Sequence, residues 1–131
     1  MKIYVLGICG TFMGGLAQLA AEKGIRVSGC DENVYPPMDQ VLLSKGISID
    51  EGYNPNNLPK DIDLVVVGNV IARGNPMIEE ILNKDIDFIS GPEFLSKYLL
   101  AKRHVVAISG THGKTSVSSM ATKVLLDNEV D

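Results

Sequence analysis

The stretch "KIYVLGICGTFMGGLAQLAAEKG", Lys2 to Gly24, decides the fold class of this 131-residue chain. It begins with an apolar, β-branched run that is typical of a buried strand. A glycine-rich loop from Gly7 to Gly15 follows, and then apolar residues spaced for a helix that stops at Gly24. A strand, a glycine loop and a helix in this order are the opening unit of a doubly wound α/β sheet.

The rest of the chain repeats this alternation of strand and helix signals. Further strands are predicted at Arg26 to Asp31, Asp63 to Asn69, Asp87 to Ser90 and His104 to Ser109, with a weaker one at Ile47 to Asp50. Helical stripes are predicted around Leu16 and Leu19, Met38 to Leu42, Ile78 to Leu82, Phe94 to Leu99 and Val117 to Leu125. Apolar strands joined by single helices predict a Rossmann-like, mainly parallel sheet that is covered on both faces.

A domain seam is expected at "LAKRH", Leu100 to His104, where a helix gives way to charged residues and a new strand. Residues 1–102 then form the Rossmann-like domain. Residues 103–131 are expected to be the first strand, phosphate loop and helix of a truncated second α/β domain.

Composition indicates a globular protein that binds neither nucleic acid nor membrane. Hydrophobic residues make up 45% of the chain, and the net charge of -4 argues against a broad nucleic-acid surface. No apolar run approaches the roughly 20 residues of a membrane span. Cys9 and Cys30 are too few for a disulfide framework, and Met1 leads directly into a strand, without a signal peptide. We therefore expect a cytoplasmic protein.

The first glycine loop, "GICGTFMGG", lies where a doubly wound fold binds phosphate groups. The dinucleotide fingerprint does not fit, because of its three glycines only Gly10 is in place. Asp31 ends the second strand, 21 positions after Gly10, where an acidic residue contacts ribose hydroxyls in Rossmann domains. The alternatives are a tight turn whose glycines only permit close packing, and an aspartate that only forms a turn or caps a helix.

A third segment, "GNVIARGNP", follows the strand at Asp63 and is expected on the same rim as the first loop. Its Asn69, Arg73 and Asn75 are polar, and Arg73 could contact a phosphate or carboxylate group. The alternative is a solvated loop with helix-capping residues.

The second glycine loop, "GTHGKTS", has the features of a phosphate-binding loop for a nucleoside triphosphate. Its glycines let the backbone wrap around phosphate, Lys114 can reach the β- and γ-phosphate oxygens, and the Thr115 hydroxyl can bind Mg²⁺. The standard motif has an additional glycine where this chain has Ile108. His112 has no identifiable catalytic partner and is interpreted as a loop residue.

The two loops, about a hundred residues apart, resemble the Mur ligases, the ATP-dependent amide-bond-forming enzymes of bacterial cell-wall synthesis. The shortened phosphate loop is the family's form, which accounts for Ile108. The resemblance covers essentially the whole chain. Family members have a uridine-nucleotide domain, a central ATPase domain and a C-terminal domain, so we expect an N-terminal fragment that is inactive by itself.

The resemblance implies the roles of individual residues. The full enzyme would phosphorylate the lactyl carboxylate of UDP-N-acetylmuramate with ATP, and an amine would then displace phosphate from the acyl phosphate. Lys114 would be catalytic, and Thr115 would contact Mg²⁺ through ATP. The implied UDP-sugar-binding residues are Gly7, Cys9, Gly10, Thr11, Phe12, Met13, Gly14, Asp31, Asn69 and Arg73. The implied ATP-binding residues are Gly110, Thr111, His112, Gly113, Lys114, Thr115 and Ser116.

Three segments, "GTFMGGLA", "DENVYPPM" and "GNVIARGNP", look most like the branch that attaches the murein tripeptide L-Ala-γ-D-Glu-meso-diaminopimelate in peptidoglycan recycling. The first alternative is the branch that attaches L-alanine to the same nucleotide. The second is a stand-alone Rossmann-type module for NAD(P) or coenzyme A, against which the failed fingerprint and the second loop both argue. The apolar tail would leave Val105 to Leu125 uncovered, so we expect it either to pack against the first domain or to join a second copy of the chain, and we favour the homodimer.

Overall fold

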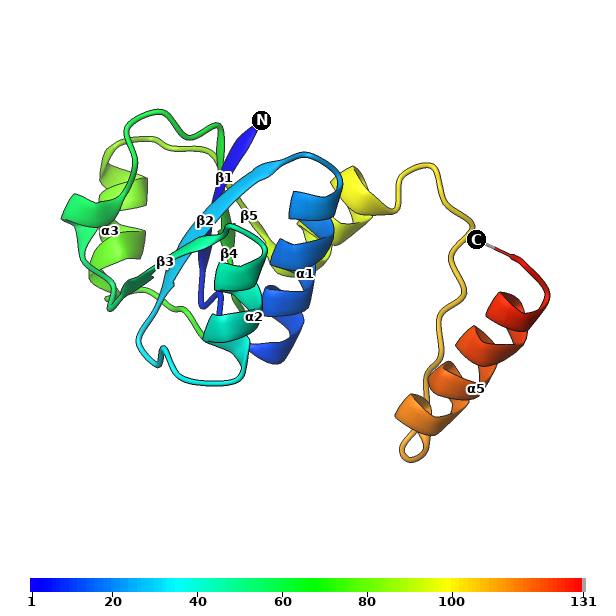
Figure 1. Ribbon diagram of the computed structural model, residues 1–131. Coiled ribbons are helices and arrows are strands. Elements are labelled where there is room, and N and C mark those ends of the chain that lie inside the picture. Colours follow the sequence, from blue (N-terminus) through cyan, green and yellow to red (C-terminus); the bar gives the residue numbers. More distant parts are fainter. Residues whose placement is uncertain (131) are drawn as a thin grey trace.

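The computed structural model describes residues 1–130 and has a single parallel sheet of five strands (Figure 1). The strands are β1 (Lys2–Leu6), β2 (Arg26–Asp31), β3 (Ser48–Glu51), β4 (Leu64–Val67) and β5 (Phe88–Ser90). Their order in the sheet is β3-β2-β1-β4-β5, and all four pairings are parallel. This is the strand order of a Rossmann-like fold, so the predicted fold class is confirmed.

Helices cover both faces of the sheet, as the apolar strands predicted. They are α1 (Thr11–Glu22), α2 (Met38–Ser44), α3 (Pro76–Asn83), α4 (Gly91–Phe94) with its π-helical continuation η2 (Leu95–Leu99), and the 3₁₀ turn η1 (Pro55–Asn57). The helices α1, α2 and α4 pack on one face, and α3 packs with η1 on the other. Asn75 caps the start of α3, since its side-chain oxygen accepts the N–H of Met77 at 2.9 Å, in agreement with the helix-capping alternative for this segment.

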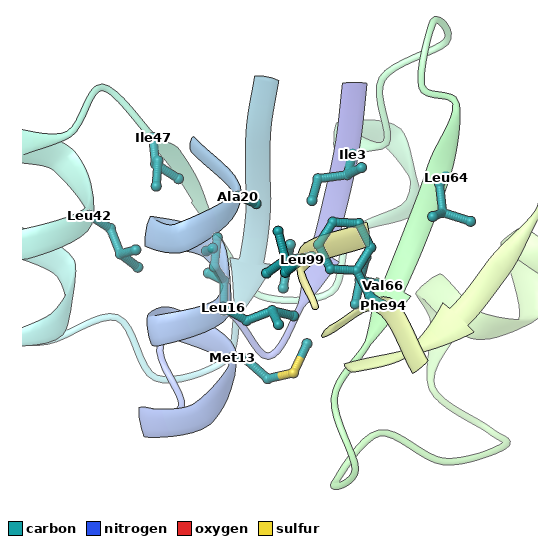
Figure 2. Close-up of a cluster of buried hydrophobic side chains, with 13 residues drawn as sticks. Ile3, Met13, Leu16, Ala20, Leu42, Ile47, Leu64, Val66, Phe94 and Leu99 are labelled. Carbon is teal, nitrogen blue, oxygen red and sulfur yellow. The ribbon is translucent and has the colours of Figure 1, made fainter. Parts of the chain in front are cut away.

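The core has two layers because successive strand residues point to opposite faces. In β1, Ile3 and Val5 join the layer beneath α1, whereas Tyr4 and Leu6 join the layer beneath α3. Figure 2 shows the first layer, in which Leu16, Phe94 and other helix residues pack on the sheet. The second layer contains a buried polar contact, since the Tyr4 hydroxyl donates to Asp50 Oδ2 at 2.8 Å.

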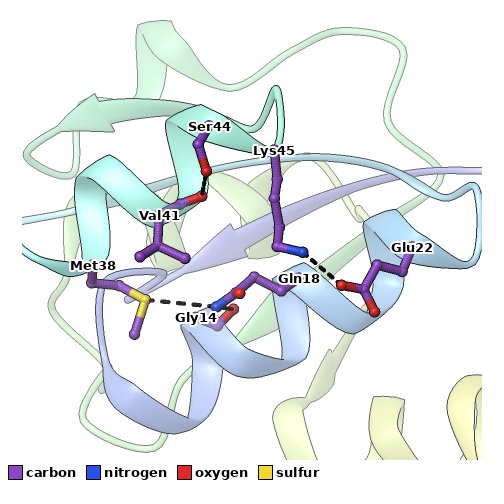
Figure 3. Close-up of polar contacts among 7 residues, drawn as sticks. All are labelled: Gly14, Gln18, Glu22, Met38, Val41, Ser44 and Lys45. Carbon is purple, nitrogen blue, oxygen red and sulfur yellow. Dashed lines mark hydrogen bonds and ion pairs between the residues drawn. The ribbon is translucent and has the colours of Figure 1, made fainter.

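Helix α2 lies against α1 where Gly14 has no side chain (Figure 3). A Cβ atom at Gly14 would lie 2.5 Å from Met38 Sδ, so a larger residue here would displace the Met38 side chain. An ion pair between Lys45 Nζ and Glu22 Oε1, at 2.6 Å, joins the other ends of the two helices. The packing fixes the chain between β2 and α2, which borders the site described below.

The tail after η2 leaves the sheet and ends in α5 (Lys114–Asp127), which lies apart from the other helices in Figure 1. The helix was predicted, but the strand predicted at His104 to Ser109 is wrong, since residues 104–110 have no regular structure. A strand needs a neighbouring strand to bond its N–H and C=O groups, and within residues 1–130 no strand pairs with this segment. Val106 and Ile108 face an apolar groove along α5, and Met120 and Val124 are still 63% and 60% exposed.

Candidate functional site

The candidate site lies at the carboxyl ends of β1 and β4, where the connections leave towards opposite faces of the sheet. Ligands of doubly wound folds bind at this switch point. A pocket of about 200 Å³ opens here between the loop after β1 and the loop after β4. The residues that line it are Gly7, Gly10, Thr11, Phe12, Met13, Gly68, Asn69 and Val70. The structure therefore brings together most residues of the first loop with Asn69.

Backbone hydrogen bonds hold the glycine loop in a tight turn. Gly7 has a φ of 76°, which a residue with a side chain rarely adopts. The N–H groups of Gly7 and Ile8 both donate to the carbonyl oxygen of Cys30, at 2.9 and 3.2 Å. The N–H of Gly10 donates to the carbonyl oxygen of Gly7 at 3.2 Å. These amide groups maintain the turn and are not directed at the pocket.

The start of α1 has the open donors. The N–H groups of Thr11, Phe12 and Met13 have no intrahelical carbonyl to bond, as at the start of any α-helix. Gly10 occupies the capping position, and no side chain caps the helix within the described residues. The helix dipole adds partial positive charge at the same point, so this end of α1 can bind an anion.

Gly14 is placed differently from the other loop residues. Its N–H donates within the helix to the carbonyl oxygen of Gly10, at 2.7 Å, and it is buried. Its missing side chain admits Met38, as described above. In the structure Gly14 therefore contributes to helix packing and lines no wall of the pocket.

A second, wider pocket adjoins the first, and Val70 lines both. The wider pocket is lined by Asp31 and Arg73, together with Tyr53 and Asn75. Asp31 and Arg73 are 42 positions apart in the sequence. Asp31 Oδ2 accepts the N–H of Cys9 at 2.9 Å, and Oδ1 accepts the N–H of Asn33 at 3.1 Å. Each oxygen keeps a lone pair that can accept a hydrogen bond from a ligand hydroxyl or ring N–H.

Arg73 is held by Glu79, a residue that the sequence did not single out. Arg73 Nε and Nη2 donate to the two carboxylate oxygens of Glu79 at 3.1 and 3.3 Å, and the N–H of Gly74 donates to Oε1 at 2.9 Å. The guanidinium group has five N–H donors, so three remain for a ligand. An acidic residue in the first turn of α3 also suits the helix dipole, which is the one signal that could have indicated Glu79.

The two cysteines are not activated nucleophiles. Burial, with the nearby carboxylates of Asp31 and Asp39, raises the pKa of Cys9 to about 11. Burial raises the pKa of Cys30 to about 12, although its hydrogen bond with Tyr4 acts in the opposite direction. A thiol with a raised pKa is protonated near neutral pH, so neither residue has the thiolate that covalent chemistry requires.

The second glycine loop lies on the tail just before α5 (Figure 1), and none of its residues lines either pocket. Gly113 has a φ of 75° and occupies the N-cap position of α5, so the helix begins at Lys114, inside the loop and before the stripe predicted from Val117. The ammonium group of Lys114 folds back and donates to the carbonyl oxygen of Gly110 at 2.7 Å. Thr111, His112, Thr115 and Ser116 are exposed.

No cluster of three or more His, Cys, Asp or Glu side chains in residues 1–130 is arranged to hold a metal ion by itself. None of the helices in the same range is both long and apolar enough to cross a membrane.

The chain is similar in sequence to enzymes of known activity. Residues 2–103 match the family model described as "Mur ligase family, catalytic domain". The chain is 50% identical over 125 residues to the UDP-N-acetylmuramate–L-alanyl-γ-D-glutamyl-meso-2,6-diaminoheptandioate ligase of Escherichia coli K12, covering 95% of this chain and 27% of the relative. It is 37% identical over 130 residues to the UDP-N-acetylmuramate–L-alanine ligase of Clostridium acetobutylicum, covering 99% and 28%.

A solved structure gives the same picture. The murein peptide ligase of Psychrobacter arcticus superposes with a TM-score of 0.93 at 50% sequence identity, over 95% of this chain and 26% of that protein. The chain thus spans about a quarter of the length of the relatives it matches.

Proposed function

Because the chain belongs to the Mur ligase family, we propose that it is the UDP-N-acetylmuramate-binding part of a ligase that joins this nucleotide sugar to L-alanyl-γ-D-glutamyl-meso-diaminopimelate in peptidoglycan recycling. The observation that carries the proposal is the uncapped start of α1, which opens into a pocket at the switch point of the sheet. Open amide groups and a helix dipole at that point suit a diphosphate.

Sequence identity supports the tripeptide over L-alanine as the second substrate. Relatives from Escherichia coli and Haemophilus influenzae that are named for the tripeptide are 50% and 48% identical to the chain. The relative from Clostridium acetobutylicum that is named for L-alanine is 37% identical. The nucleotide sugar is common to both names, so the assignment of UDP-N-acetylmuramate does not depend on this choice.

In the proposed complex the ligand spans the two adjoining pockets. The diphosphate would accept the N–H groups of Thr11, Phe12 and Met13, and Gly10 would let it approach the backbone. The uridine would extend into the wider pocket. Its ribose hydroxyls and ring N–H are donors for Asp31, and its carbonyl oxygens are acceptors for Arg73. Asn69 lines the first pocket and would contact the ligand there.

We further propose that residues 1–102 form the nucleotide-sugar domain and that residues 103–131 begin the ATP-binding domain. The phosphate loop and its helix are formed, and the Lys114 ammonium needs only to leave the Gly110 carbonyl oxygen to bind the terminal phosphate of ATP. The exposed Thr115 hydroxyl, at the second residue of α5, suits a Mg²⁺ ion that the nucleotide brings with it. That ion would neutralise charge on the phosphate oxygens.

Two finer statements complete the proposal. The two free cysteines suit a reducing compartment, and we propose a cytoplasmic location. The apolar face of α5 is exposed in the 131-residue chain, and we propose that two copies pair through it.

Calorimetry on the 131-residue chain tests the proposed function. We expect binding of UDP-N-acetylmuramate and none of NAD. For ATP we expect a dissociation constant weaker than about 1 mM, or roughly 4 kcal/mol, because the loop supplies phosphate contacts alone. Affinity for NAD but not for the nucleotide sugar would overturn the proposal.

Two matched variants make the test specific to the loop. Gly10→Val places a side chain beside the open amide groups, and its Cβ would lie 3.3 Å from the carbonyl oxygen of Gly7. Gly15→Val makes the same change on α1, where a Cβ would meet nothing within 4 Å. We expect only Gly10→Val to abolish binding of UDP-N-acetylmuramate.

A further inference from the structure

Two apolar side chains flank the open amide groups of α1. Phe12 is the second residue of the helix and is 46% exposed, and Val70 in the loop after β4 is 87% exposed. Both line the small pocket at the switch point. Single exposed apolar residues are common, but two that face one pocket beside an anion site indicate contact with an apolar part of the ligand.

The Phe12 ring occupies space that a glycine on a different element leaves open. A Cβ atom at Gly91, the first residue of α4, would lie 2.8 Å from Phe12 Cε1 and 2.7 Å from Met13 Sδ. Real Cβ contacts are essentially never this short. The missing side chain at Gly91 therefore leaves the space that the ring occupies.

The order of the strands indicates which part of a bound nucleotide sugar would lie beside Phe12. Asp31 ends β2 on one side of β1, whereas the start of α4, where Gly91 lies beside the Phe12 ring, follows β5 on the other side. If the diphosphate lies at the start of α1 and the nucleoside occupies the wider pocket with Asp31 and Arg73, the group at the other end of the diphosphate can lie beside Phe12, towards α4. In a nucleotide sugar that group is the sugar.

We propose that Phe12 determines specificity for the sugar moiety of the bound nucleotide sugar by packing its ring against the apolar C–H face and acetamido methyl group of the pyranose. The inference rests on the proposed function, since it assumes that the diphosphate binds at α1. Aromatic side chains supply large apolar contact area with a defined orientation, as such a contact requires.

Calorimetry with UDP and with UDP-N-acetylmuramate tests the inference on the 131-residue chain. For Phe12→Ala we expect UDP-N-acetylmuramate to bind about tenfold more weakly, or ~1.4 kcal/mol, while the affinity for UDP changes by less than about twofold. Phe12→Leu should recover part of the loss because it keeps an apolar wall. The matched control is Leu19→Ala, which removes a 49% exposed side chain on the same helix that lines neither pocket.

Gly91→Ala provides an independent perturbation, because it displaces the Phe12 ring without removing it. We expect the same selective loss of affinity for UDP-N-acetylmuramate, in a protein whose unfolding remains cooperative. Equal weakening of both ligands, or no change with either variant, would overturn the role of Phe12 and leave the proposed function standing. If the unaltered chain binds neither UDP nor UDP-N-acetylmuramate, the proposed function is wrong and this inference falls with it.

Discussion

The carboxylate of Asp31 accepts a hydrogen bond from the backbone N–H of Cys9, with 2.9 Å between the nitrogen and Oδ2. The bond connects the end of β2 to the glycine loop that follows β1. In dinucleotide-binding folds an acidic residue at this strand end hydrogen-bonds a ribose hydroxyl. Here it also shapes the loop that would bind the diphosphate, so one side chain links the two pockets.

This link predicts a loss of both stability and affinity in Asp31→Ala. The variant leaves the Cys9 N–H without its partner, and we expect the free energy of unfolding to fall by about 1–3 kcal/mol. Asp31→Asn keeps an oxygen acceptor and should lose less. Urea unfolding gives the stability, and calorimetry with UDP, which lacks the sugar, gives the affinity. An Asp31→Ala variant that binds UDP as well as the unaltered chain would show that the loop does not depend on this bond.

Glu79 should affect ligand affinity through Arg73 and Gly74. We expect Glu79→Ala to destabilise the chain by no more than about 1 kcal/mol, since its partners are at the surface. The affinity for UDP-N-acetylmuramate should fall severalfold, because Arg73 is no longer held at the pocket. Glu80→Ala is the control, as it removes a neighbouring carboxylate that pairs with Lys84 at 2.7 Å. Equal affinities in the two variants would exclude a positioning role for Glu79.

The contact between Tyr4 and Asp50 should contribute to stability in the second core layer. Tyr4→Phe removes a hydroxyl donor from a fully buried side chain and leaves Asp50 without its partner. We expect a loss of about 1–3 kcal/mol in urea unfolding. Tyr35→Phe removes a hydroxyl from a side chain that is 65% exposed, and it should change stability very little.

The chain should become less stable in alkaline solution. The pKa of Cys9 is raised to about 11 and that of Cys30 to about 12, mainly by burial. In the unfolded chain these thiols lose their protons near their ordinary pKa, about 8.5, while the folded chain still retains them. Unfolding therefore becomes more favourable as the pH rises from about 9 towards 12. Urea unfolding across this range should show a shallower decline for Cys30→Ala, and an unchanged slope would contradict the assignment.

Self-association of the 131-residue chain should depend on the apolar face of α5. We expect light scattering to show dimers at high concentration and monomers for a Met120→Lys, Val124→Lys double variant, because charges on this face oppose its burial. The double variant should bind UDP-N-acetylmuramate normally, since both residues lie outside the two pockets. Monomers of the unaltered chain at high concentration would refute pairing through α5.

Local sequence patterns predicted the elements of the sheet because each depends on its own residues. The strand β1 lies at the apolar run that predicted it. Asn75 caps α3, and the helix α5 follows the glycines of the second loop. The strand at His104 to Ser109 has the right composition, but strand formation depends on a neighbour that composition does not reveal.

The contacts that shape the site are between residues distant in sequence, and patterns do not indicate them. Asp31 accepts a hydrogen bond from the N–H of Cys9, which is 22 positions away in the sequence. Gly91 leaves space for the ring of Phe12, which is 79 positions away. Gly14 was read as part of a phosphate loop, and the approach of Met38 gives it a second reason to be glycine. Such reasons appear only when the elements are packed together.

The uncapped start of α1 makes a bound anion the helix's missing cap. Hydrogen exchange at the first turn of α1 should therefore slow when the ligand binds, because its oxygens take over the role of a capping side chain. Gly10→Ser would supply that cap permanently and add roughly a few tenths of a kcal/mol to helix stability, but its hydroxyl would compete with the ligand for the same amide groups. This end of the helix can be strengthened or left open for an anion, and the two aims exclude each other.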